Sequence, residues 1–129
     1  MANEGVYVLW LYLPQTCSIT IGKLGKFPFE QGVYAYVGSA QRNLEQRVAR
    51  HRRLDKKFHW HIDYFRAKAD FLGATLFFDH TRDKECWLVR ELMRIPTSLF
   101  PVPGFGSSDC ECGSHFVYLP LAWPRVSTS

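Results

Sequence analysis

The sequence predicts an α+β fold in which a small, mainly antiparallel sheet is flanked by helices. The 129 residues are 47% hydrophobic, 16% aromatic and 22% charged, a composition typical of one globular domain with an adequate core. Short aromatic and β-branched runs alternate with segments of helical periodicity, in the order β-β-β-α-α-β-α-β. We expect one domain over residues 1–119 and a flexible tail over residues 120–129.

Five segments are predicted to be strands. The first is apolar, β-branched and aromatic, and it ends before Pro14, as expected of a buried strand. The second alternates polar and apolar residues, and Gly22–Gly25 then turns the chain. In the third, Tyr34 and Tyr36 share a face because strand side chains repeat every second residue. The predicted strands are Gly5–Leu13, Ser18–Ile21, Val33–Val37, Phe71–Phe78 and His115–Leu119.

Three segments are predicted to be helices, Gln41–Arg53, Trp60–Ala69 and Lys84–Arg94. Ser39 or Asn43 is available to cap the first, and Pro96 stops the third. The stretch from residue 99 to residue 114 is rich in Pro, Gly and Ser and is expected to be a loop.

The sequence predicts a cytoplasmic protein with no membrane partner. Every apolar run is interrupted well short of the roughly 20 residues that a membrane span needs. The start of the chain, Met1–Glu4, has neither the basic nor the apolar segment of a signal peptide. We therefore expect the four cysteines to be reduced thiols or metal ligands.

The excess positive charge is concentrated in one segment. Residues 42–57 contain seven basic and two acidic residues and carry +5, so the remainder of the chain sums to −1 of the net +4. Such a patch suits a nucleic acid, since neutralising phosphates releases counterions; a solvated helix face is the alternative. The candidates for nucleic-acid contacts are Arg42, Arg50, Arg53, Lys56 and Lys57.

Charged side chains fall on the inner faces of two predicted helices. At about 100° per residue, Arg47 and His51 lie with the apolar stripe of the first helix, whereas Arg50 and Arg53 point to solvent. Glu85 lies on the inner stripe of the third helix. Because a buried charge needs a partner, Arg47 and Glu85 either pair with each other or face an anionic substrate and a divalent cation.

These residues resemble the motifs of the GIY-YIG nuclease superfamily. Gly5–Tyr7 and Tyr36–Gly38 are similar to its two tripeptides, Arg47 and His51 follow in the spacing of its helix, and Glu85 stands where the family has a metal-binding glutamate. The resemblance spans most of the chain and is greatest to an uncharacterised branch that is sometimes fused to endonuclease III-type glycosylases. The segments 59–64 and 103–112 are similar to that branch.

The resemblance implies a role for each residue. Tyr7 would be the general base or orient the attacking water, and Tyr36 would support it by hydrogen bonding. Arg47 would stabilise charge on the scissile phosphate, and His51 would assist by proton transfer or phosphate contact. Glu85 would hold one Mg²⁺ or Mn²⁺. A phenol with a pKa of about 10 needs a nearby metal or cation to act as a base.

The resemblance therefore implies a metal-dependent DNA endonuclease with a role in DNA repair, with DNA and a base-repair glycosylase as partners. The family's asparagine after the last helix has no counterpart here, so either a group in the Ser107–His115 loop takes its place or the domain does not cleave. The alternatives are a catalytically silent nucleic-acid-binding accessory module using the basic segment, and a structural or interaction domain in which Arg47 and Glu85 merely pair.

Two weaker signals accompany this site. Cys110, Cys112 and His115 have the composition of a zinc site, although their spacing is unusual for one, and small buried thiols are the favoured interpretation. His59 and His61 precede Asp63; we interpret them as structural, with an oriented His–Asp pair as the alternative.

Overall fold

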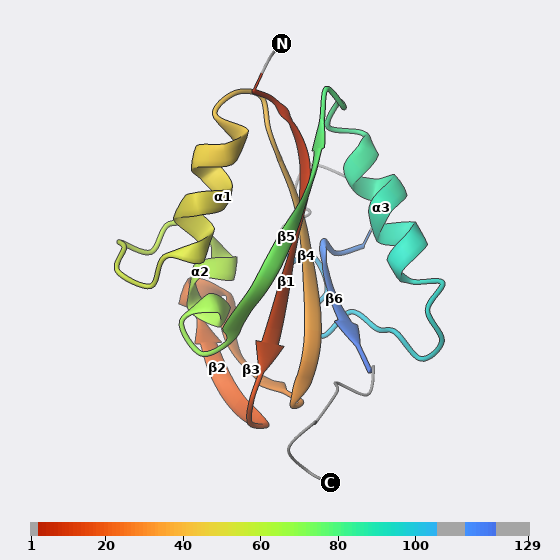
Figure 1. Cartoon of the computed structure of the whole chain (residues 1–129). Helices are drawn as coiled ribbons and strands as arrows, with labels where there is room; N and C mark the ends of the chain where they lie inside the picture. Colours follow the sequence, from red (N-terminus) through yellow and green to blue (C-terminus); the bar gives the residue numbers. More distant parts are fainter. Residues whose placement is uncertain (1–2, 106–112, 121–129) are drawn as a thin grey trace, which may run out of the picture.

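The computed structural model, which describes residues 3–105 and 113–120, confirms the α+β class (Figure 1). An antiparallel four-stranded sheet has the order β5-β1-β4-β6, and β2 and β3 form a separate antiparallel pair. Within the described ranges no helix is long and apolar enough to cross a membrane. The strands are β1 (Gly5–Leu13), β2 (Cys17–Ile21), β3 (Gly25–Phe29), β4 (Gly32–Ala40), β5 (Asp70–Phe78) and β6 (Phe116–Leu119).

Helices cover both faces of the four-stranded sheet. α1 (Leu44–Arg52) and α2 (His61–Arg66) lie on one side and α3 (Lys84–Leu92) on the other (Figure 1). Alternate residues of β1 and β4 supply the two cores, because successive strand side chains point to opposite faces. Tyr7 and Tyr36 belong to the core under α1 and α2, whereas the valines next to them belong to the core under α3.

The sequence missed one strand, β3, and extended the helices too far. β3 contains Pro28, which lacks an amide donor and is tolerated because the β2–β3 pair is all edge. α1 begins three residues later than predicted, since Asn43 adopts a left-handed conformation (φ 57°) that no helix continues through. α2 and α3 also end earlier than predicted, at Arg66 and Leu92.

The first turn of α1 is capped from outside the helix. Neither predicted cap acts. Ser39 lies within β4, and Asn43 precedes the helix but makes no capping hydrogen bond with its side chain. Instead Asn3 accepts from the first two amides of the helix: its backbone carbonyl from Leu44 N–H (3.0 Å) and its side-chain carbonyl from Glu45 N–H (3.2 Å). The segment before β1 thereby ties α1 to the sheet, which fixes the helix residues that face the cavity described below.

Candidate functional site

One cavity of about 600 Å³ is lined by four of the five catalytic candidates that the sequence singled out. Tyr7 from β1, Tyr36 from β4, Arg47 from α1 and Glu85 from α3 all line it. Its walls also carry side chains from the loop before α1, from the start of α2 and the segment before it, from the loop before α3 and from the residue before β6. These further lining residues with ionisable side chains are Arg42, His59, His61, Arg82 and His115.

The pairing of β1 with β4 places the two tyrosines at the same point of the sheet. Tyr7 lies opposite Gly38, and Tyr36 lies opposite Leu9, two residues along the same strand pair. The rings of Tyr7 and Tyr36 are 6.5 Å apart between centroids. The intervening β2–β3 pair does not disturb this register, so the long insertion between the two tripeptides leaves them side by side.

Gly38 is required by the ring of Tyr7. A Cβ atom added to Gly38 would lie 2.9 Å from Tyr7 Cε1 and nearer still to Cζ and the hydroxyl. Real Cβ atoms do not approach other atoms this closely, and the phenol is wedged among buried neighbours. The glycine of the second tripeptide therefore makes room for the tyrosine of the first.

We expect Gly38→Ala to displace the Tyr7 ring and to destabilise the domain by about 1–3 kcal/mol, the usual effect of overpacking a core. Chemical denaturation would measure the loss. Gly104→Ala is the matched control for space, because nothing lies within 4 Å of the added Cβ, although its positive φ adds some strain. If Gly38→Ala were as stable as the unaltered chain, the close approach would not be a real constraint.

Tyr7 is buried and hydrogen-bonded to His51. Its hydroxyl lies 2.9 Å from His51 Nε2, and both side chains are almost fully buried. Burial, with the electrostatic influence of Tyr36 and Glu85, raises the pKa of Tyr7 well above its ordinary value, while Arg47 opposes the shift. Tyr7 is therefore a neutral phenol in the free protein, and deprotonation requires added positive charge or a proton acceptor. His51 lies behind Tyr7 rather than in the cavity wall.

His51 is a neutral base. Burial lowers its pKa from 6.5 to about 3; Asp63 opposes that shift, and the cations Lys56, Arg50 and Arg47 reinforce it. The imidazole therefore carries one proton at neutral pH and offers one lone pair. Tyr7 and His51 are thus a donor–acceptor pair without net charge.

This buried neutral histidine makes stability depend on pH. Below pH 6.5 the unfolded chain binds a proton at His51 that the folded protein does not, so the free energy of unfolding should fall between about pH 6.5 and 3, by several kcal/mol at the acid end. His115, whose pKa burial also lowers, adds to the slope. Denaturant titrations across this range should show a shallower slope for His51→Gln than for His80→Gln, a change at an exposed histidine. Equal slopes would contradict a neutral His51.

Arg47 faces the cavity, as its helix position predicts. Its Nη1 donates to the Ser39 carbonyl (3.1 Å), and its guanidinium lies over the Trp60 ring, 5.0 Å from the centroid. Both Arg47 and Glu85 are among the described residues, and no ion pair joins them. The positive charge of Arg47 is thus directed to the cavity rather than to Glu85.

Glu85 is the one carboxylate that the described residues contribute to the wall of this cavity. It is 6% exposed, and its Oε1 lies 3.6 Å from His115 Nδ1. No cluster of three or more His, Cys, Asp or Glu in residues 3–105 and 113–120 could hold a metal. A single carboxylate nevertheless fits Mg²⁺, which keeps several waters and binds through one or two carboxylates and substrate phosphates. His115 lies after α3, the last helix, and directly before β6.

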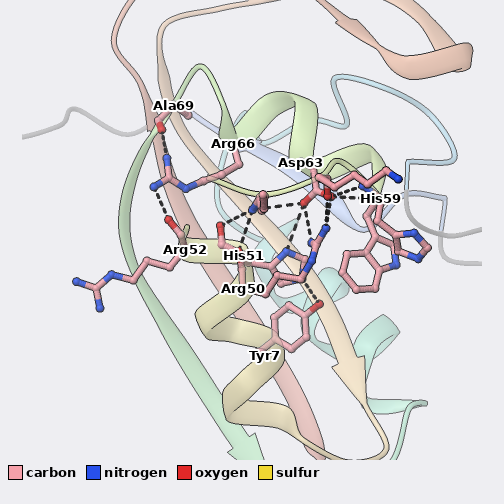
Figure 2. Close-up of polar contacts among 11 residues, drawn as sticks. Tyr7, Arg50, His51, Arg52, His59, Asp63, Arg66 and Ala69 are labelled. Atoms are coloured by element: carbon pink, nitrogen blue, oxygen red, sulfur yellow. Dashed lines mark hydrogen bonds and ion pairs between the residues drawn. The ribbon is translucent and has the colours of Figure 1, made fainter. Parts of the chain in front are cut away.

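Two of the five basic candidates are structural rather than free to bind nucleic acid. The prediction that Arg50 points to solvent is wrong: it forms a two-pronged ion pair with buried Asp63, at 3.2 Å to each oxygen (Figure 2). Lys56 lies 3.5 Å from the same carboxylate and donates to two carbonyls in the last turn of α1, those of Arg50 and His51. Arg42, Arg53 and Lys57 remain exposed.

Asp63 is a functional candidate whose histidine partner the sequence did not identify, because the local sequence pointed only to His59 and His61. It accepts backbone hydrogen bonds from His59 (2.7 Å) and Trp60 (2.9 Å), but the imidazole facing it is that of His51. Burial raises the pKa of Asp63, yet the Arg50 and backbone hydrogen bonds outweigh it, and the pKa stays below its usual value. Asp63 is thus a buried carboxylate ion. The sequence signal for it was a capping aspartate at the third position of α2.

The predicted zinc ligands are not brought together in the described part of the chain. Cys110 and Cys112 lie outside it, and His115 is directed at Glu85. Cys86 is disulfide-bonded, which corrects the expectation of a reduced thiol there, whereas Cys17 is free and exposed.

Sequence comparison assigns the chain to a family. A family model described as a domain of unknown function, DUF123, matches residues 6–127. Neither the comparison with curated proteins nor that with solved structures returned a match. The matched range covers every helix and strand apart from the first residue of β1, and so includes all five of the helices and strands that line the cavity. The chain belongs to the DUF123 family.

Proposed function

We propose that this domain is a divalent-metal-dependent endonuclease that hydrolyses phosphodiester bonds in DNA. The observation that carries the proposal is the convergence of Tyr7, Tyr36, Arg47 and Glu85 on one open cavity. In the described part of the chain, three guanidinium groups and one carboxylate line it, so it attracts a polyanion and leaves one site for a cation. The resemblance to GIY-YIG nucleases supports the same reaction. A cytoplasmic location stays a prediction.

The residues divide the chemistry among them. Arg47 would contact a non-bridging phosphate oxygen and offset the charge that develops there. Glu85 would hold one Mg²⁺ or Mn²⁺, which polarises the phosphoryl group when bound. Tyr36 would flank the attacking water, since it lines the same cavity as Tyr7.

Tyr7 would pass a proton between water and His51. As the water oxygen bonds to phosphorus, its proton moves to Tyr7 Oη while the phenol proton moves to His51 Nε2 over their 2.9 Å hydrogen bond. The bond from phosphorus to the leaving sugar oxygen breaks, and that oxygen takes a proton from solvent. The reverse transfer then returns the proton of His51 to solvent through Tyr7, which restores both groups.

A plasmid-nicking assay tests this proposal directly. The chain with Mg²⁺ or Mn²⁺ should convert supercoiled DNA to the nicked form, and a chelator should stop it. Retained DNA binding without nicking in any metal would instead favour a silent accessory module that serves a partner such as a base-repair glycosylase. Absence of both would leave a structural domain.

The exposed part of the basic segment should carry DNA affinity. We expect Arg53→Glu and Lys57→Glu each to weaken DNA binding and to make the slope of log K against log salt shallower by about 1 for each phosphate that is no longer neutralised. Lys26→Glu, an exposed charge reversal on β3, is the matched control. Fluorescence anisotropy over a range of salt would measure both quantities. If Arg53→Glu and Lys57→Glu bound DNA with unchanged affinity, the basic segment would not be part of the DNA interface. Arg50 is unsuitable for this test because it holds Asp63.

A further inference from the structure

Beneath Tyr7 lies a second layer of polar groups that ends in the carboxylate of Asp63. Tyr7 Oη lies 2.9 Å from His51 Nε2, and on the far side of the ring His51 Nδ1 lies 3.9 Å from Asp63 Oδ1 (Figure 2). His51 and Asp63 are 2% and 0% exposed. The three side chains come from β1, α1 and α2. The tertiary fold, not closeness in sequence, therefore lines up the phenol, the imidazole and the carboxylate.

We infer that Asp63 is a positioning residue that holds His51 in the tautomer with the proton on Nδ1, so that Nε2 is free to accept the proton of Tyr7. The inference deepens the proposed nuclease function and rests on it for its catalytic consequence. It assigns Asp63 a role beyond anchoring Arg50.

The surroundings of His51 support this tautomer. Nδ1 has no hydrogen-bond partner among the described residues, and the nearest acceptor is the Asp63 carboxylate. A proton on Nδ1 points toward that negative charge, whereas a bare lone pair there would face it. The other charged groups around the ring, Lys56, Arg50 and Arg47, are cations and cannot accept a proton. The rings of Tyr7, Tyr36 and Trp60 pack around it.

The carboxylate is also held ready for the imidazolium. Arg50 and the amides of His59 and Trp60 fix Asp63 in place, and the distance of 3.9 Å from Asp63 Oδ1 to His51 Nδ1 is longer than a hydrogen bond but within reach of an ion pair. When Nε2 takes the phenol proton, the new positive charge is attracted to Asp63. The proton on Nδ1 does not leave, so the carboxylate stabilises the charge without being protonated.

The tautomer can be read without any DNA. In the full chain labelled with ¹⁵N-histidine, two-bond ¹H–¹⁵N spectra at neutral pH should show His51 protonated at Nδ1 and bare at Nε2, with the signal assigned from its loss in His51→Gln. A proton on Nε2, or on both nitrogens, would overturn the inference. This reading needs no variant of Asp63 and so does not depend on how well such a variant folds.

Asp63→Asn tests whether the charge of Asp63 sets the tautomer of His51. The amide keeps the size of the side chain but not its charge, so the Nδ1–H form should no longer dominate, and kcat should fall about 100-fold at an unchanged KM. Lys56→Gln removes a different contact of the same carboxylate and should leave the tautomer as it is. If Asp63→Asn kept both the tautomer and kcat, Asp63 would be structural only. The Nδ1–H tautomer in a protein that never cleaves DNA would sink the proposed function and leave the positioning of His51 standing.

Discussion

Replacing Glu85 with glutamine should abolish DNA cleavage and leave DNA binding intact. The amide keeps the shape of a side chain that is 6% exposed, but it loses the negative charge that a divalent cation needs. Removing one preorganised charge from a site of this kind costs about 10²–10³-fold in rate. Plasmid nicking under single-turnover conditions would measure the rate, and anisotropy would measure the affinity.

Glu91→Gln is the matched control for this variant. Glu91 lies on the same helix, but its carboxylate is exposed and pairs with Arg94 at 3.5 Å, away from the cavity. The Glu91→Gln variant should cleave DNA at the rate of the unaltered chain. Equal cleavage by Glu85→Gln would show that no metal is held there, and weakened DNA binding by Glu85→Gln would show that the carboxylate shapes the cavity instead.

Tyr7→Phe should lower the cleavage rate by about 10²–10⁴-fold, the usual contribution of a general acid–base group. The change removes only the hydroxyl, so the ring still fills the space beside Gly38. It also leaves His51 Nε2 without its partner, which should cost about 1–3 kcal/mol of stability. Rates at temperatures well below the unfolding transition separate the two effects.

Tyr34→Phe makes the same chemical change at another buried position. Its hydroxyl donates to the Glu30 carbonyl (2.6 Å) and does not line the cavity. We expect a loss of stability without a loss of cleavage. A Tyr7→Phe variant that cleaved as well as Tyr34→Phe would exclude Tyr7 as the group that takes the proton from water.

The apolar, β-branched and aromatic runs predicted most of the strands well because they reflect burial. Gly5–Leu13 was predicted to the residue, since a strand flanked by two others is apolar on both faces. β3 was missed because Pro28 and the glycines around it are poor strand formers, and only its pairing with β2 makes it a strand. The start of α1 was misjudged because Asn43 adopts a backbone conformation that periodicity does not register.

Helical periodicity also predicted that Arg47, His51 and Glu85 lie on the inner faces of their helices, because the backbone position of each residue decides which way it faces. It failed for Arg50, because a long side chain can bend back from the helix surface to reach a buried acid. That acid, Asp63, lies 12 residues after His51 and on another helix, and no local pattern links the two. Contacts between elements that are distant in sequence are set by the packing of α1 against α2, which the sequence does not display.

The position of β1 in the sheet has a consequence for how the molecule fluctuates. Nine residue pairs join β1 to β4 and eight join it to β5, so removing β1 from the sheet means breaking two ladders. β6, by contrast, is held by four pairs on one side and by the isolated bridge from Leu99 to Tyr118. Amide hydrogens of β1 should therefore exchange with solvent only through global unfolding, and those of β6 through smaller openings. β1, which carries Tyr7, is consequently the most slowly exchanging part of the cavity wall. The wall next to His115 is the part that would move if the proposed nucleic-acid substrate entered.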